Sequence, residues 1–321
     1  MGESAEPPVD EAAASFDRMA ADYDTIWEFP WYAWLFTRLH VLILHNVIQP
    51  YAPRSILDVG CGTGIQSFFH AAFGAHVQGI DISPSMIRVA RTKAAMPHAD
   101  PITPMTMPGP LAFLRSYYHR IREHLHGADP PGVSPTFQIA DARHLPFRDH
   151  TFDHVNCCGS VLSLVPEYGT VLTEIARVLK PGGTLFLEAE GRWNGDLFWT
   201  LADALSGGHL GYRMPWRRAI ALVAPPLTAP VTIDYPFEDN CLKLTLFTRQ
   251  SLQRYLQGLG LRTLKTWTIH SLTNLIPSPL LHRRNLPVAV LQLFRVLAYA
   301  EERIPLALPG CSLVFLARKE G

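Results

Sequence analysis

The chain has 321 residues, and its 28 lysines and arginines balance 28 aspartates and glutamates, so the formal net charge is zero. Apolar residues make up 48% of the chain and charged residues only 17%, which excludes a disordered or solvating chain. Because a balanced chain lacks the positive field on which nonspecific nucleic-acid binding depends, nucleic acid is not expected as a partner.

The five cysteines form neither a CxxC pair nor a Cys/His cluster, so no metal site is expected. An odd number of cysteines, with an acidic N-terminus unlike a signal peptide, favours the reducing cytoplasm. Polar residues interrupt every apolar run before it reaches the roughly 18 residues of a spanning helix. The sequence thus predicts a soluble, cytoplasmic protein and leaves open a peripheral contact with a membrane. It does not indicate the oligomeric state.

Residues 1–50 are predicted to form an N-terminal helical cap segment, ahead of one domain over residues 51–321. That domain opens with two strand–helix units, whose strands are expected at Ser55–Gly60 and His76–Ile82. Ser83-Pro84 supplies an N-cap and a first-turn proline for the second helix. This alternation is typical of a doubly wound α/β sheet.

The rhythm breaks over about 96–135, which holds eight prolines and is interpreted as an insertion around an amphipathic stretch at 111–126. Two further insertions are expected at about 192–240 and 271–310. The later elements are expected as the strands Thr136–Asp141, Phe152–Cys158 and Thr184–Ala189 with a helix Glu167–Lys180, then the strands Cys241–Phe247, Leu261–Thr268 and Ser312–Ala317 with helices Gln250–Gly258 and Val288–Ile304.

The sharpest motif is a strand that runs into a glycine-rich turn, ILDVGCGTG over residues 56–64. Glycines at 60, 62 and 64 permit a tight turn and let a ligand lie directly against the backbone at a helix N-terminus. A nucleotide-like ligand is therefore expected. The dinucleotide fingerprint GxGxxG would need glycine at position 65, and Ile65 stands there, which disfavours a nicotinamide-dependent oxidoreductase.

Three carboxylates, Asp58, Asp81 and Asp141, fall at the ends of successive predicted strands, the edge where open α/β sheets bind ligands. Asp81 follows Gly64 by 17 residues, where an acid accepts hydrogen bonds from both hydroxyls of a ribose. Each acid alone is equally well a turn or cap residue, but their joint placement indicates one binding edge.

Four blocks in order, LDVGCGTG, GIDISPSMIRVAR, DARHLPFRDHTFDHV and ARVLKPGGTLFLE, resemble the class I S-adenosylmethionine-dependent methyltransferases, in particular the small-molecule branch of ubiquinone and menaquinone biosynthesis. The resemblance implies a Rossmann-like sheet of seven strands, the last antiparallel, with helical insertions forming a cap. It implies S-adenosylmethionine as the methyl donor. The opening segment 16–24 resembles the leader that packs over this donor in small-molecule members.

The resemblance also implies which residues hold the donor. The methionine part would lie against the glycine turn with its amino group near Asp58, the ribose would bind Asp81, and the sulfonium would lie near Cys158. The full set of expected donor-binding residues is Asp58, Gly60, Cys61, Gly62, Gly64, Asp81, Ile82, Met86, Asp141, Ala142, Cys158 and Gly159. Of these, Ile82 and Met86 would flank the adenine, and Asp141 with Ala142 would contact its amino edge.

Acceptor binding does not transfer from the resemblance, because Leu164 stands where many relatives carry a histidine before Val-Pro. The expected acceptor is a small, apolar molecule methylated on oxygen or carbon, since aromatic and aliphatic residues fill the N-terminal segment and the insertions. Candidates for a general base are Glu188 and Glu190 first, and then His270 and His144. A non-catalytic scaffold that binds the donor remains an alternative.

Overall fold

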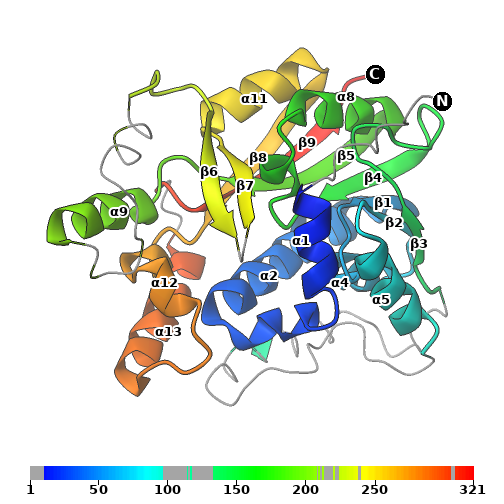
Figure 1. Cartoon of the computed structure of the whole chain (residues 1–321). Coiled ribbons are helices and arrows are strands. Elements are labelled where there is room, and N and C mark those ends of the chain that lie inside the picture. The colour runs from blue at the N-terminus through cyan, green and yellow to red at the C-terminus, as the bar shows by residue number, and fades with distance from the viewer. Residues whose placement is uncertain are drawn as a thin grey trace, which may run out of the picture.

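The computed structural model describes residues 11–96, 114, 116–117, 133–207, 209, 212, 220, 224–237, 240–304 and 308–321. Its centre is a seven-stranded sheet in the order β3-β2-β1-β4-β5-β9-β8, in which only β9 runs antiparallel to its neighbours (Figure 1). The strands are β1 (Ser55–Val59), β2 (His76–Asp81), β3 (Thr136–Ile139), β4 (Phe152–Cys157), β5 (Leu179–Glu190), β8 (Leu261–Ile269) and β9 (Ser312–Lys319). The predicted doubly wound α/β fold, with seven strands and an antiparallel last strand, is confirmed.

Side chains alternate along the central strands between two separate cores. On β5, Leu185 and Leu187 belong to one core while Phe186 belongs to the other. The same alternation on β9 places Phe315 with the first core and Val314 with the second. The helices between strands are α4 (Ile65–Ala71), α5 (Pro84–Ala94), α7 (Val161–Leu164), α8 (Tyr168–Val178) and α11 (Arg249–Gly258).

The N-terminal segment is helical and packs on the sheet. It comprises α1 (Glu11–Met19), the 3₁₀ helix η1 (Tyr23–Glu28), α2 (Pro30–Ile43), the π-helical turn η2 (Leu44–Ile48) and α3 (Gln49–Tyr51). Pro30 at the first position presets the backbone for α2. This helix is buried on nearly every side, with Trp31, Trp34 and Phe36 all in the core, so its aromatic residues serve first as packing.

The prediction for the end of helix α8 is wrong. The sequence analysis extended that helix to Lys180 and began the next strand at Thr184, whereas α8 ends at Val178 and β5 begins at Leu179. Pro181 disfavours helical geometry in the residue before it. Leu179 also pairs with Phe152 of β4, a partner far away in the sequence that fixes extended backbone five residues earlier than expected.

The region 192–240, predicted as irregular, contains regular structure. Helix α9 (Gly195–Ser206) begins at an N-cap, because the Asn194 side chain accepts a hydrogen bond from Leu197 N at 3.1 Å. The strands β6 (Val231–Phe237) and β7 (Asn240–Leu246) form a separate antiparallel pair. The remaining helices of the cap are η4 (Thr273–Leu275), α12 (Ser278–Leu281) and α13 (Val288–Arg303). Most of the predicted stretch 111–126 lies outside the described residues.

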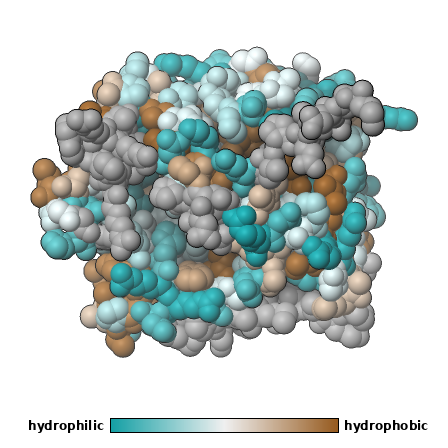
Figure 2. All heavy atoms as spheres, viewed as in Figure 1, coloured by the Kyte–Doolittle hydropathy of each residue, from teal (hydrophilic) through white to brown (hydrophobic). Residues whose placement is uncertain are grey.

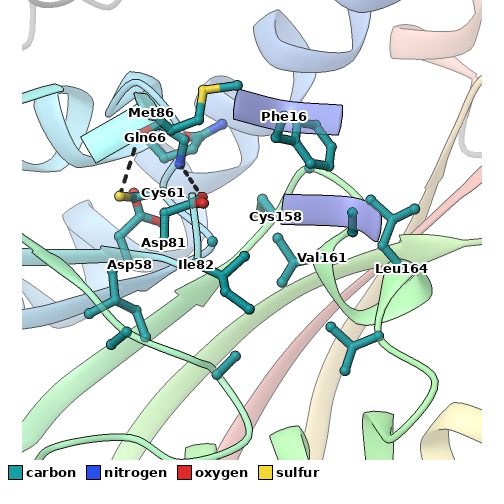
Figure 3. A pocket seen from close by; sticks show the side chains of 18 of the residues that line it. Phe16, Asp58, Cys61, Gln66, Asp81, Ile82, Met86, Cys158, Val161 and Leu164 are labelled. Atoms are coloured by element: carbon teal, nitrogen blue, oxygen red, sulfur yellow. Dashed lines mark hydrogen bonds between the residues drawn. The ribbon is translucent and has the colours of Figure 1, made fainter. Parts of the chain in front are cut away.

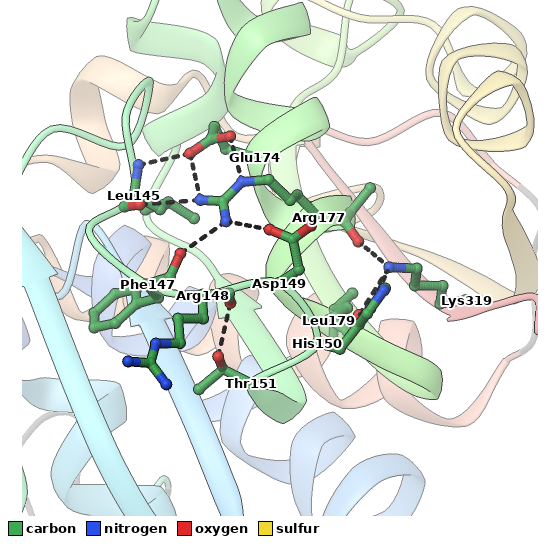
Figure 4. A network of polar contacts seen from close by, with 11 residues as sticks. Leu145, Phe147, Arg148, Asp149, His150, Thr151, Glu174, Arg177, Leu179 and Lys319 are labelled. Atoms are coloured by element: carbon green, nitrogen blue, oxygen red, sulfur yellow. Dashed lines mark hydrogen bonds and ion pairs between the residues drawn. The ribbon is translucent and has the colours of Figure 1, made fainter.

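Arg177 on α8 holds the loop that leads from β3 to β4 (Figure 4). Its guanidinium donates two hydrogen bonds to Glu174 at 2.8 Å, one to Asp149 at 2.8 Å, and one each to the carbonyls of Leu145 and Phe147 at 3.0 and 2.7 Å. A planar guanidinium satisfies five acceptors in this way because its donors form a fixed fork. The loop that carries Asp141 to the sheet edge is therefore anchored to a helix.

Replacing Arg177 with alanine is expected to lower the free energy of unfolding by about 2–3 kcal/mol, because the loop carbonyls and Glu174 lose their donors. Arg177→Lys keeps the positive charge but lacks the planar set of five donors, so the free energy of unfolding should fall by about half as much as in the alanine variant. Chemical denaturation measures both. Arg262→Ala, an exposed arginine with one long ion pair at 3.9 Å, is the control and should change stability by less than about 0.5 kcal/mol. Equal losses at positions 177 and 262 would contradict this role.

Candidate functional site

The turn between β1 and α4 needs its glycines. Gly60, Gly62 and Gly64 have φ angles of 68°, 53° and 90°, a region that other residues rarely adopt. A Cβ on Gly60 would also lie 2.2 Å from Cγ2 of Val161. The turn is held from behind by Cys61 N, which donates to Ile80 O at 2.8 Å. Gly64 caps α4 and packs near Phe68 and Phe137 rather than lining the cleft described below.

Asp81, the last residue of β2, is tied directly to this turn (Figure 3). Its Oδ2 accepts a hydrogen bond from Gly62 N at 2.9 Å, and its Oδ1 accepts one from Ser83 N at 2.8 Å. Burial raises the pKa of the Asp81 carboxyl despite these two donors. A carboxylate has about four acceptor sites, so both oxygens retain capacity for a ligand.

A cleft of about 1080 Å³, counting its open mouth, lies over the glycine turn at the carboxyl ends of the strands. Because this volume includes the open mouth, it lies just above the range of roughly 300–1,000 Å³ that is usual for small-ligand sites. Eleven of the twelve predicted donor-binding residues line it, all but Gly64: Asp58, Gly60, Cys61, Gly62, Asp81, Ile82, Met86, Asp141, Ala142, Cys158 and Gly159. The structure thus brings together, in one cleft, residues spread over a hundred positions of sequence.

Asp58 and Asp141 both line this cleft, and their pKa values are shifted in opposite directions. Asp58 is buried, and burial raises its pKa to about 6, although Ser67 Oγ and Asn156 Nδ2 donate to it at 2.6 and 2.7 Å. For Asp141, burial also raises the pKa, but hydrogen bonds from Arg143 at 2.7–3.1 Å outweigh it and leave that pKa lowered. Asp141 is therefore firmly ionised, while the Asp58 charge is costly without a cation nearby.

The N-terminal segment closes one side of the cleft. Phe16 and Tyr23 both line it. The Asp17 carboxylate accepts hydrogen bonds from Ser83 Oγ at 2.5 Å and Ser85 N at 2.8 Å, which fastens α1 to the start of α5. Asp24 in turn accepts a hydrogen bond from Thr63 in the glycine turn at 2.6 Å.

Gln66 was missed by the sequence analysis. It lies in the first turn of α4, lines the cleft, is only 6% exposed, and neither its Oε1 nor its Nε2 has a hydrogen-bond partner. A buried amide without partners is costly, so a ligand group or a water is expected to satisfy it. Its position just after a glycine-rich turn was the available signal. Phe36 and Arg143 also line the cleft without having been assigned to donor binding.

Two of the predicted bases, Glu188 and Glu190, lie behind the loop that follows β4. Glu188 accepts hydrogen bonds from Gly159 N and Ser160 N at 3.0 and 2.7 Å, and Glu190 accepts one from Ser160 Oγ at 2.6 Å. Burial raises both pKa values, and the Glu188 charge helps to raise that of Glu190 to about 8. Neither carboxylate lines the cleft directly, but Ser160 stands between Gly159 and Val161, which do.

The third predicted base, His270, lies outside the cleft. Its ring is fully buried and stacks on Trp31 with centroids 3.6 Å apart, and its Nδ1 is 2.9 Å from Thr273 Oγ1. Burial lowers its pKa to about 3, so it is neutral at physiological pH. This environment is that of a packing residue. His144 does not line the cleft either.

Within the described residues, no group of three or more histidine, cysteine, aspartate and glutamate side chains is arranged to hold a metal ion. In the same part of the chain, every helix is too short or too polar to cross a membrane.

Two family models match the chain, both described as a methyltransferase domain, over residues 56–107 and 115–187. The demethylmenaquinone methyltransferase of Symbiobacterium thermophilum is 32% identical over 181 residues, covering 52% of this chain and 54% of that protein. The methyltransferase GfsG of Streptomyces halstedii is 30% identical over 145 residues, 44% of this chain and 40% of that protein. The chain thus spans about half the length of these relatives.

Among solved structures, a protein of Methanosarcina mazei described as a SAM-dependent methyltransferase is similar, with 21% identity and a TM-score of 0.49 over 87% of this chain and 97% of that one.

Because the pKa of Glu190 is raised, the free energy of unfolding should depend on pH. Since the folded state keeps this proton to about pH 8 and an unfolded glutamate releases it near pH 4.5, the folded state is favoured at low pH, and that advantage is lost as pH rises to about 8. We compare the drop in the free energy of unfolding between pH 6.5 and 8, a window that begins at the pKa of an unfolded histidine. This drop should be smaller for Glu190→Gln than for the unchanged chain, by about 1–2 kcal/mol.

Denaturant titrations at each pH test this, without added ligand. Glu320→Gln, at an exposed position near the C-terminus, is the matched control and should follow the unchanged chain. Parallel stability curves for Glu190→Gln and the unchanged chain would show that this carboxyl does not carry the pH dependence.

Proposed function

We propose that this chain, which belongs to the class I S-adenosylmethionine-dependent methyltransferase family, transfers the donor's methyl group to a small, apolar acceptor through oxygen or carbon. The observation that carries this proposal is the half-buried Asp81 carboxylate, which is hydrogen-bonded to the glycine turn and lines the cleft. When bound, S-adenosylmethionine supplies an electrophilic methyl group on a positively charged sulfur.

The residues of the cleft fit this donor. Asp81 has acceptor capacity left for ribose hydroxyls, and Ile82 and Met86 offer apolar surface to an adenine. Asp58 lies where a donor ammonium group would stabilise its carboxylate, since burial otherwise raises its pKa to about 6. The unpartnered Gln66 amide adds one more hydrogen-bonding group at the same end of the cleft.

The charge of the cleft favours a cationic donor over a dinucleotide. Its lining carries three carboxylates, Asp58, Asp81 and Asp141, against the single guanidinium of Arg143, which Asp141 already neutralises. A sulfonium and an ammonium group gain from that field, whereas an anionic pyrophosphate is repelled by it. This argument, together with Ile65 in the glycine motif, opposes a nicotinamide-dependent oxidoreductase.

For acceptors with a hydroxyl group, the proposed base is Glu190, acting through Ser160. The Ser160 hydroxyl donates to Glu190 at 2.6 Å, so a proton taken from the acceptor by Ser160 Oγ can pass on to the carboxylate. With a pKa of about 8, this carboxyl becomes available as a base as the pH rises toward 8. Ser160 has a φ of 61°, and backbone strain of this kind often accompanies functional loops.

An apolar acceptor is supported by the rest of the lining. Beyond the donor residues, the cleft presents Phe36, Val161, Leu164 and Val165. Leu164 cannot serve as a base, so chemistry in this cleft depends on orientation, exclusion of water and the Ser160–Glu190 pair. Two relatives are named for quinones, a demethylmenaquinone methyltransferase and a ubiquinone biosynthesis O-methyltransferase, which agrees with a small, apolar acceptor.

Replacing Asp81 with asparagine is expected to weaken donor binding about 10- to 100-fold, because charge-assisted hydrogen bonds to the ribose are lost. Titration calorimetry with S-adenosylmethionine measures this, and NADH in parallel tests the oxidoreductase alternative. Asp234→Asn, on the separate β6–β7 pair, is the control and should bind normally. Unchanged affinity in Asp81→Asn, or a preference for NADH, would contradict the assignment.

Incubating the protein with isotopically labelled donor and a cell lipid extract separates an enzyme from a scaffold. The proposal predicts label in an apolar small molecule, and for a hydroxyl acceptor a loss of about 10²–10³ in rate with Glu190→Gln at unchanged donor affinity. Donor binding without any labelled product would favour the scaffold.

A further inference from the structure

Helix α9 buries polar side chains and exposes two large apolar ones. Asp203 and Thr200 are buried, and Asp196 accepts hydrogen bonds from Tyr212 Oη and from Asn274 Nδ2, the latter at 3.0 Å. By contrast, Phe198 and Leu205 are 64% and 91% exposed. A helix that packs only on its own domain usually buries its apolar side. The exposed apolar residues of α9 therefore indicate a surface that binds a partner.

Helix α13 repeats this pattern. Glu301 faces inward and accepts hydrogen bonds from the backbone N–H groups of residues 270–273 at 2.9–3.1 Å and from Trp34 Nε1 at 3.2 Å. Glu302 accepts a hydrogen bond from Tyr117 Oη and pairs with Arg38 at 3.6 Å. In the sequence, these two glutamates give α13 charges of both signs. In the structure, both carboxylates bind groups of the protein itself.

The exposed side of α13 carries three large apolar residues beside Gln292 and two arginines. Leu293, Val296 and Tyr299, spaced by three residues along one side of the helix, are 51%, 63% and 52% exposed. Helices α9 and α13 both pack against η4, whose Leu275 is exposed as well. Phe198, Leu205, Leu275, Leu293, Val296 and Tyr299 together form what we term the α9–α13 apolar face.

The space-filling view shows the regions of the two helices as separate apolar areas. Brown spheres lie at the left edge of the molecule in Figure 2 and again at its lower left, where Figure 1 draws α9 and α13, with teal and white spheres between the two groups. Several large apolar side chains exposed on neighbouring helices are typical of an interaction surface.

The charges beside the face select its partner. Arg295 and Arg303 are exposed on α13, and the Arg303 guanidinium lies 4.0 Å from the Tyr299 ring centre. Apolar residues flanked by arginines, with an aromatic ring between, match the boundary between acyl chains and anionic head groups. A second copy docked face to face would bring the same arginines toward each other, which opposes a symmetric dimer here.

We propose that the α9–α13 apolar face docks the protein on a bilayer surface that contains anionic phospholipids. The helices lie in the interface, Leu293, Val296 and Phe198 enter the acyl boundary, and Arg295 and Arg303 contact phosphate groups. This docking does not depend on methyl transfer, because no residue of the face lines the donor cleft.

Flotation of the full chain with vesicles tests the proposal, using phosphatidylcholine and phosphatidylglycerol at three to one, and phosphatidylcholine alone. The unchanged protein should float with the anionic vesicles, and less so in high salt. The double variant Leu293→Ser/Val296→Ser should bind about tenfold more weakly or worse. Arg295→Gln/Arg303→Gln should lose the preference for anionic vesicles. Tyr255→Ser, which removes an aromatic residue that is 42% exposed on α11, is the control and should float normally.

Thermal unfolding and donor affinity should be unchanged in every variant, which separates this proposal from that on methyl transfer. Failure of the unchanged protein to float, or equal flotation of the Leu293→Ser/Val296→Ser variant, would overturn docking. A dimer in light scattering that this variant dissociates, with no vesicle binding, would identify the face as a contact between copies and also overturn it.

Discussion

The half-buried Asp81 carboxylate makes the contact on which the arrangement of the site depends. By accepting hydrogen bonds from Gly62 N and Ser83 N, it joins the turn after β1 to the end of β2. Asp17 fastens the N-terminal segment to the same serine. Removing a carboxylate from water destabilises its charged form, and these donors offset that effect only in part, so the pKa of Asp81 stays raised. We expect a ligand with hydroxyl groups and a positive charge to stabilise the carboxylate further.

Local sequence was sufficient for the strands and helices that position the site. Burial on both faces makes β1 an almost continuous apolar run, and Ser83 with Pro84 marks the start of α5. The errors arose where distant pairing decides the backbone. Leu179 is extended because it pairs with Phe152. Helix α9 buries Thr200 and Asp203 while it exposes Phe198 and Leu205, which blurs the apolar periodicity that identifies a helix.

The same division holds for the site. The glycine turn and Asp81 were identifiable because their chemistry and spacing are local. His270 was not, since only the fold reveals Trp31 stacked on its ring across more than two hundred residues. The role of Gln66 depends on burial without a partner, and that of Glu190 on the nearby Glu188 charge. Neither property is encoded in a short motif.

The most direct test of the account is a crystal structure of the chain grown with S-adenosylmethionine. The account predicts the adenosine in the cleft, with its ribose hydroxyls on the Asp81 carboxylate and its amino-acid end beside Asp58 and Gln66. An empty cleft at saturating donor concentration, or a donor bound elsewhere on the protein, would contradict it.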